Sequence, residues 1–347
     1  MTTATTMLPT EPAGPAEPGQ ADADAPRRIK ARPAPADVVF RFAARSAGAA
    51  VLAVALLVGS FLAYRAGRAL GVAKWGFFTT ERWEPDEYSG GFGIAAVLSG
   101  TVVIAVIAIA FAVPLAVGAA LYISEYSPRR IRRGLVSLVD LMAAVPSVVY
   151  GLFGVFLLQP NAIHLSRWLA TYLGWIPFFR VSDYDVTNPL SSITVFTASS
   201  FMAGMVVAMM VTPIVCSISR EVFAQAPVGE REGAYALGGT RWGMIRTVVL
   251  PYGRGGIIGG AMLGLGRALG ETIAVYMIIS PVFEIQWHVL QTGAISVSSL
   301  IALRYGDAGE FQISALMAAG LALFLMTLLV NFAASIIIGR SRSGAAS

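Results

Sequence analysis

Long apolar runs alternate with short polar connections along most of this chain. Six runs are long enough to cross a bilayer, whose hydrocarbon core of roughly 30 Å needs about 18–20 helical residues. Because a helix satisfies its own backbone hydrogen bonds in lipid, we expect each run to be helical. The runs cover residues 43–66, 92–124, 134–158, 193–219, 254–282 and 313–339. The pattern predicts an all-α integral membrane protein with about six transmembrane helices.

Composition supports a membrane-embedded chain. Of 347 residues, 56% are hydrophobic and only 13% are charged. A soluble domain of this length has too little interior to bury so much apolar surface. Residues 1–40 differ, because they are rich in Ala, Pro and acidic residues without an apolar period, and we expect a disordered cytoplasmic tail there. The membrane domain then covers residues 41–340.

Basic residues gather in alternate connections between the apolar runs. They lie before the first run, in the second and fourth connections and after the last run, for example Arg41, Arg130, Arg231, Arg246 and Arg340. By the positive-inside rule, we expect both termini and the loop at 220–253 to be cytoplasmic. The formal net charge of +5 therefore reflects topology, and we expect no nucleic-acid partner. Because Cys216, His164 and His288 are scattered, we also expect no metal site.

The loop at 220–253 carries the pattern E-x-A-x3-G-x9-V-x-L-P, formed by Glu232, Ala234, Gly238, Val248, Leu250 and Pro251. Pro227 can open a helix that Gly238 ends. Thr240 can cap a second helix, which we expect to end before Pro251. The pattern resembles the EAA loop of ABC-importer permeases, the element that docks into the ATPase subunit. The alternative is an ordinary amphipathic hairpin at the membrane surface.

The fifth apolar run contains two charged residues, Arg267 and Glu271, among glycines. Four residues apart on one helix, they would share a face and lie deep in the hydrocarbon core. Charged groups at such depth usually serve a function, and we interpret this pair as part of a substrate path. The alternative is a structural ion pair that locks two helices together. Small residues on the same stripe predict close helix packing at Gly256, Gly260 and Gly264.

The third run combines an acidic residue with helix-interrupting ones. Pro146 and Gly151 lie inside it, and such interruptions are tolerated beside transport pathways. Asp140 precedes them and is a third candidate for the substrate path. Its alternative role is that of a polar residue at the membrane interface, near the start of its helix.

Residues 141–154, the loop at 220–253 and residues 264–274 together resemble the permeases of the bacterial phosphate ABC importer, and the last segment is most similar to PstC. The resemblance covers about residues 40–340. It implies a type I ABC-importer permease architecture, in which Arg267 and Glu271 match residues implicated in phosphate passage. It also implies a heterodimer with a PstA-type permease, two copies of an ATPase and an extracytoplasmic phosphate-binding protein.

The expected function is that of the permease subunit of an ATP-driven phosphate importer in the bacterial plasma membrane. The chain lacks the G-x4-G-K-[ST] pattern, so ATP would be bound by the partner ATPase. We accordingly expect no catalytic residues and no cofactor in this chain. Two alternatives stay open: an ABC permease for another oxyanion, such as sulfate or molybdate, and an ion-coupled secondary carrier. The second leaves the docking loop unexplained.

Overall fold

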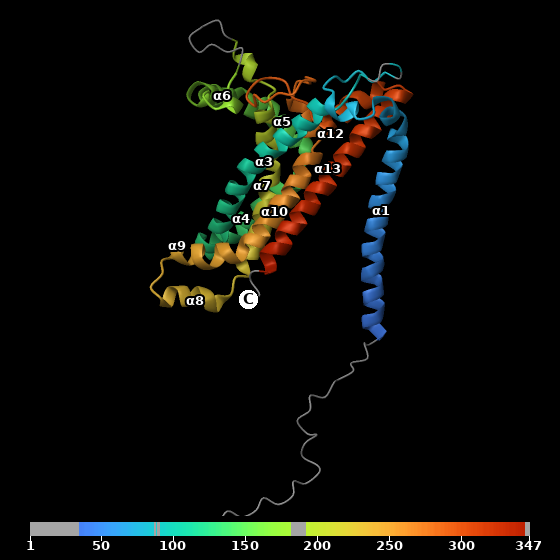
Figure 1. The fold of residues 1–347 in the computed structure, drawn as a ribbon. Helices are drawn as coiled ribbons and strands as arrows, with labels where there is room; N and C mark the ends of the chain where they lie inside the picture. Colours follow the sequence, from blue (N-terminus) through green and yellow to red (C-terminus); the bar gives the residue numbers. More distant parts are fainter. Residues whose placement is uncertain (1–34, 87, 89–90, 182–191, 344–347) are drawn as a thin grey trace, which may run out of the picture. The chain divides into compact units, whose positions relative to one another are not determined.

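The computed structural model describes residues 35–86, 88, 91–181 and 192–343. Six helical stretches in this part of the chain are long and apolar enough to cross a membrane (Figure 1), which confirms the predicted number. They are α1 (Pro35–Ala73), α3 (Ala95–Leu121) with the π-helix η1 (Tyr122–Tyr126), the α5–α6 segment, α7 (Ser200–Ala224), the α9–α10 segment and α13 (Glu310–Ser343).

The N-terminal boundary differs from the expected one. Most of the predicted tail, up to residue 34, lies outside the described residues, whereas residues 35–40 already belong to α1. The chain divides within α1 into two units, at residues 56 and 57. In the second unit, Ser314 joins α13 to the C-terminal part of α1. Its Oγ donates to the Arg65 carbonyl at 2.7 Å and accepts from the Ala69 amide at 3.2 Å.

The central core is built from α3, α7 and α10, which pack along one another. Glycines of α10 permit the close approach that the sequence predicts. A Cβ placed on Gly256 would lie 2.4 Å from the Val222 side chain, and one on Gly264 would lie 2.5 Å from Val211. The stripe of small residues is therefore the contact surface of α10 with α7.

The third predicted run, 134–158, is not one helix. Helix α4 (Arg129–Ala144) ends before Val145 and Pro146, both extended, and α5 (Ser147–Phe153) begins after them. Proline lacks an amide hydrogen and disfavours helical geometry at the residue before it, which explains the break. The chain then continues through η2 (Gly154–Leu158) into α6 (Gln159–Leu173).

The fifth predicted run, 254–282, is interrupted as well. Helix α10 (Leu250–Gly270) ends before Glu271, which is extended, and α11 (Ile273–Ile278) is short. The N-terminus of α12 (Val297–Arg304) packs at this interruption, where Ser298 Oγ donates to the Glu271 carbonyl at 2.7 Å. The hydroxyl supplies a hydrogen bond for a carbonyl that has left the helix.

The connections hold only short elements. These are α2 (Gly76–Thr79), η3 (Pro177–Phe179), η4 (Ile193–Phe196), α8 (Val228–Ala236), α9 (Arg241–Met244), η5 (Ile245–Val249) and η6 (Tyr305–Asp307). Among the described residues, the β-structure is limited to one isolated bridge between Ser199 and Thr292. Helices α8 and α9 lie at one end of the bundle and α6 at the other (Figure 1).

Candidate functional site

The loop with the spaced motif forms the helix–turn–helix that the sequence predicts. Pro227 precedes α8, and Gly238 turns the chain after it with a positive φ of 80°. A positive φ is easily adopted only by glycine, so this residue type is required at the turn. The Thr240 hydroxyl caps α9 by accepting a hydrogen bond from the Gly243 amide at 3.1 Å.

The expected end of the second helix before Pro251 is wrong. Helix α9 continues through the π-helical turn η5 into α10, so that Pro251 lies in the first turn of α10. A proline is tolerated where its missing amide hydrogen would have no regular helical partner, and the wide turn before it provides such a position. The loop is therefore joined directly to the helix that carries Arg267.

A groove of about 530 Å³ lies between α8 and the α9–η5 segment. Its lining is mostly small or apolar: Glu230, Gly233, Ala234, Leu237, Gly239, Gly243, Met244, Thr247 and Val248. Leu237 is 91% exposed at the turn. An apolar side chain so exposed beside an open groove is typical of a contact with another protein.

The predicted docking residues occupy different positions around this groove. Ala234 lines it, whereas Glu232, Gly238 and Pro251 are exposed beside it, and Leu250 is half-buried against the core. The motif itself did not single out Leu237, Gly243 and Thr247. The sequence signal for Leu237 is a large apolar residue directly before the helix-ending glycines.

A second cavity, of about 550 Å³, contains Arg267. It is lined by Ile214, Met262, Leu263, Gly266, Arg267, Thr327 and Asn331. Thr327 and Asn331 lie one turn apart on α13, so they present a hydroxyl and an amide on the same side of that helix. The sequence reading missed both residues, although polar side chains inside an apolar run are a recognisable signal.

The cavity around Arg267 is followed along the same two helices by another of about 500 Å³. Its lining includes Gly270, Thr272 and Ser298, with Leu323 from α13. Leu323, Thr327 and Asn331 are each four residues apart, and they follow one face of α13. The lining of both cavities is mainly apolar: Arg267, Thr327 and Asn331 are the polar side chains of the first. Residues of α12 and η6 line most of the second, which reaches the interruption after Gly270.

Glu271 does not share a helical face with Arg267, contrary to expectation. It lies beyond the end of α10, is 8% exposed, and is not within ion-pair distance of the guanidinium in the described structure. The i,i+4 relation fails because the chain becomes extended at Glu271 itself. Asp140 is exposed near the end of α4, outside the lining of the Arg267 cavity.

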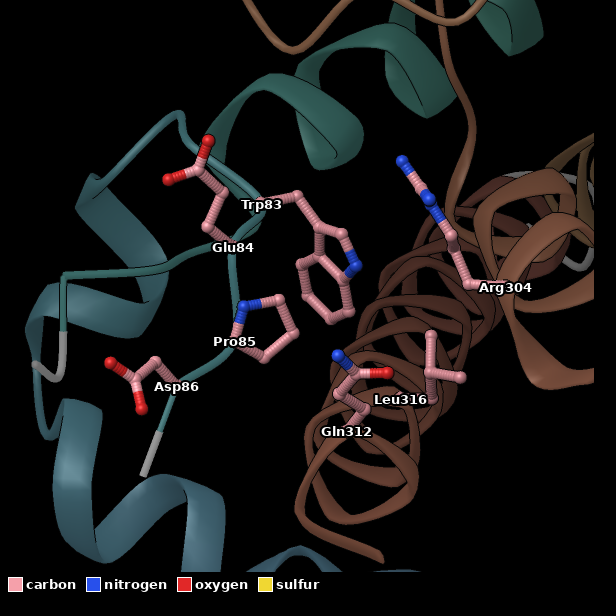
Figure 2. Close-up of a pocket in the computed structure, with 7 residues that line it drawn as sticks. All are labelled: Trp83, Glu84, Pro85, Asp86, Arg304, Gln312 and Leu316. Carbon is pink, nitrogen blue, oxygen red and sulfur yellow. The ribbon is translucent and has the colours of Figure 1, made fainter. Parts of the chain in front are cut away.

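A further cavity, of about 360 Å³, has the opposite electrostatic character (Figure 2). Glu84 and Asp86 lie on one side of it, and Arg304 and Gln312 on the other. The lining residues include two acidic side chains and one basic one, although in Figure 2 both carboxylates point away from Arg304 and the rings of Trp83 and Pro85 lie between them. Among the cavities described, the one around Arg267 has the better chemistry for an anionic substrate.

The same fold occurs in the crystal structure of a bacterial ABC transporter involved in the import of the acidic polysaccharide alginate. The likeness covers 87% of this chain and 98% of that chain, with a TM-score of 0.50 and 18% sequence identity. The class defined by this fold is the type I ABC-importer permease.

Sequence comparison gives the family. A family model described as binding-protein-dependent transport system inner membrane component matches residues 112–343. The phosphate transport system permease protein PstC 2 of Mycobacterium tuberculosis is 39% identical, covering 88% of this chain and 93% of that protein. PstC of Xylella fastidiosa is 35% identical, covering 89% and 92%. The chain belongs to the binding-protein-dependent transport system inner membrane component family, in which its relatives are PstC permeases.

Proposed function

We propose that this chain is the permease subunit of an ATP-driven importer of inorganic phosphate in the bacterial plasma membrane. The observation that carries the proposal is Arg267, an exposed arginine of a spanning helix that lines one cavity with Thr327 and Asn331, in a chain whose relatives are named phosphate permeases. A guanidinium offers a planar fork of donors that matches two phosphate oxygens. Thr327 and Asn331 can add hydrogen bonds from the opposite side of the cavity.

Glu271 has a different role from that of a direct partner of Arg267. Its carboxylate is buried where the helix ends, beyond the cavity that holds the guanidinium. Glu271 lines neither cavity, but its negative charge beyond the Arg267 cavity would oppose tight binding of an anion there and keep passage reversible. A protonated phosphate can donate a hydrogen bond to a carboxylate, whereas fully ionised sulfate cannot, so Glu271 would favour phosphate over sulfate.

An importer of this kind needs an external energy source and a partner that supplies it. An inside-negative potential opposes inward movement of an anion by about 2.3 kcal/mol per charge per 100 mV. The groove between α8 and α9 is the proposed contact with the ATPase, with both termini and this loop in the cytoplasm. A PstA-type permease, two ATPase copies and an extracytoplasmic phosphate-binding protein complete the proposed complex. ATP is then bound and hydrolysed by the ATPase, and this chain supplies the path.

The test is phosphate uptake by the complex reconstituted into vesicles, with Arg267→Gln compared with the parent. We expect uptake to fall by about a hundredfold, since a bidentate contact to a desolvated anion is lost. Arg254→Gln is the matched control, because Arg254 is an arginine of the same helix that is exposed, as Arg267 is, but does not line the cavity. Normal uptake by an assembled Arg267→Gln complex would contradict the proposed path. Uptake that sulfate inhibits as strongly as unlabelled phosphate would point to a broader oxyanion permease.

A further inference from the structure

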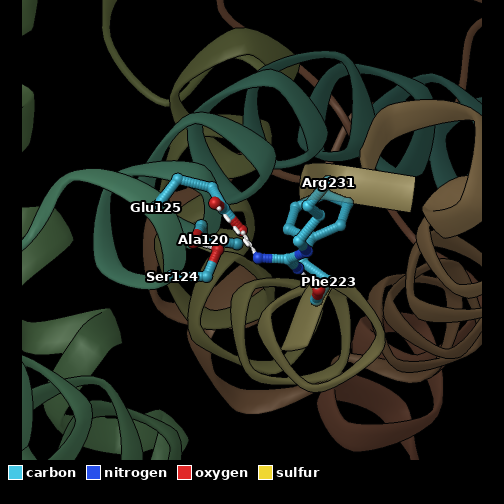
Figure 3. A network of polar contacts seen from close by, with 5 residues as sticks. All are labelled: Ala120, Ser124, Glu125, Phe223 and Arg231. Carbon is cyan, nitrogen blue, oxygen red and sulfur yellow. Dashed lines mark hydrogen bonds and ion pairs between the residues drawn. The ribbon is translucent and has the colours of Figure 1, made fainter. Parts of the chain in front are cut away.

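A buried ion pair joins the docking helix to the membrane helices. Glu125, whose side chain is 6% exposed, lies in η1 at the end of α3 and faces Arg231 of α8 (Figure 3). Arg231 Nη1 lies 3.1 Å from Glu125 Oε1 and donates to Oε2 at 3.3 Å. Its Nη2 donates to the carbonyl of Phe223 on α7. One guanidinium therefore connects α8 with both α3 and α7.

The same turn of η1 also contacts the second helix of the loop. Arg241 is the first residue of α9, and its guanidinium lies 5.1 Å from the ring centre of Tyr126. Glu125 and Tyr126 are neighbours, so adjacent residues hold α8 and α9 separately. The π-helical form of η1 supports a functional role for these contacts, because single π-helical turns are frequent at functional sites. Within it, Ser124 Oγ donates to the Ala120 carbonyl at 2.8 Å.

Stability alone is a weak reason for this arrangement. Removing the Glu125 carboxylate and most of the Arg231 guanidinium from water is unfavourable, and the attraction between them often only offsets that cost. An apolar contact between α8 and α3 would hold the loop about as well. The pair also fixes orientation, since two hydrogen bonds from one planar group, to Glu125 and to the Phe223 carbonyl, set the position of α8 relative to two transmembrane helices.

We infer that the Glu125–Arg231 pair carries the movement of the docking helix into the membrane domain. This role rests on the proposed contact of the groove with the ATPase. Glu125 and Arg231 are then positioning residues for transport. When the ATPase moves α8, the pair moves the adjoining ends of α3 and α7. Both helices pack against α10, which carries Arg267. A loop attached by its backbone alone would instead bend at Pro227 and Gly238.

The test uses the assembled complex and compares Glu125→Gln, Arg231→Gln and the double variant with the parent. Three quantities are measured: ATPase retained on purification, the thermal midpoint of the complex, and the stimulation of ATP hydrolysis by phosphate-loaded binding protein. We expect each single variant to keep its ATPase but to lose about tenfold in stimulation, the usual size of a coupling effect. Glu221→Gln is the matched control, since Glu221 is an exposed glutamate of α7.

The double variant separates coupling from stability. A single substitution leaves one buried charge without its partner and lowers the thermal midpoint, whereas the double variant removes both charges and should regain part of it. Stimulation should stay low in the double variant, because the link is still absent. Recovery of stimulation together with stability would show that the pair only avoids an unpaired charge, and would overturn the inference.

Arg231→Lys covers the case in which the neutral variants do not assemble. Its ammonium can pair with Glu125 but cannot hold the carboxylate and the Phe223 carbonyl in one planar fork, so we expect stimulation between those of the parent and the neutral variants. Parental stimulation in Arg231→Lys would overturn the inference. Leu237→Glu tests the underlying docking role separately: it should release the ATPase, and retention at the parental level would count against the proposed contact instead.

Discussion

Two of the predicted apolar runs, 134–158 and 254–282, are interrupted in the structure, and the interruptions are held in different ways. Between α4 and α5 the break lies at Val145 and Pro146, and Tyr150 Oη donates across it to the Met142 carbonyl at 2.9 Å. Between α10 and α11 no proline is present at the break. There the hydroxyl comes from Ser298, which belongs to α12 and lies 27 residues further along the chain than Glu271.

The difference lies in whether a helix break is determined by its own residues or also by contacts with another helix. A proline interrupts a helix wherever its neighbours lie, because the missing amide hydrogen and the ring are fixed by covalent structure. The break at Glu271 is held both by Ser298 of α12 and by the local Thr272 hydroxyl, which donates to the Gly270 carbonyl at 3.2 Å. The two breaks meet, since Gly151 of α5 packs against Ala274 and Met277 of α11. An interruption fixed by proline thus lies beside one that is held partly by a contact with α12.

The largest effect is expected where α12 is held in position. A Cβ on Gly100 of α3 would lie 2.2 Å from the Ile295 carbonyl oxygen, and Ile295 directly precedes the capping residue of α12. A backbone atom cannot move aside as easily as a flexible side chain, so Gly100→Ala should lower the free energy of unfolding by about 3 kcal/mol, the upper end of the usual cost of overpacking. The measurement is the thermal midpoint and yield of the purified complex.

Gly118→Ala is the matched substitution on the same helix. A Cβ at Gly118 meets no atom within 4 Å, and alanine is the better helix former. This variant should be neutral or more stable by about 0.5–1 kcal/mol. If the Gly100→Ala and Gly118→Ala complexes had the same thermal midpoint, the close approach at Gly100 would not be what positions α12.

The sequence predicts those features that are determined by residues close together in the chain, and it misses those that depend on residues far apart. The start of α8, the turn after it and the cap of α9 were predicted correctly because Pro227, Gly238 and Thr240 act on their immediate neighbours, whereas the expected end before Pro251 was wrong. Pro146 carried the same local signal, although the run around it was still interpreted as one helix. The break at Glu271 has no such signal, because it is set partly by residues of α12 that the chain reaches only after a long connection.

The same distinction between local and long-range features applies to the candidate site. Arg267 was identified because a charge inside an apolar run is unusual, and Thr327 and Asn331 could have been found by the same argument. Their presence in one cavity required the packing of α13 against α10. The pairing of Glu125 with Arg231, separated by 106 residues, has no counterpart in any local pattern.

An intermediate effect is expected from Ser298→Ala, which removes the hydroxyl at the break that lacks a proline. The Glu271 carbonyl would then be left in a buried place without this donor, at a cost of about 1–3 kcal/mol. Phosphate uptake should fall together with the thermal midpoint, because the break lies beside Arg267. Ser99→Ala is the control, since its hydroxyl bonds only within its own helix, to the Ala96 carbonyl. Unchanged uptake and melting in Ser298→Ala would mean that the interruption does not depend on α12.

The smallest effect is expected from Tyr150→Phe, the corresponding change at the proline break. The phenol hydroxyl is lost, but the Met142 carbonyl still accepts a hydrogen bond from the Val145 amide at 3.3 Å, and Pro146 still interrupts the helix. The aromatic ring, which is buried, keeps its packing. The cost should therefore stay near the net value of one hydrogen bond, about 0.5–1.5 kcal/mol, with uptake close to that of the parent. The measurement is again melting and uptake, side by side with Ser298→Ala. A Tyr150→Phe complex that lost more activity than Ser298→Ala would reverse the comparison, and would make the phenol a functional group of the path and not a support of a local break.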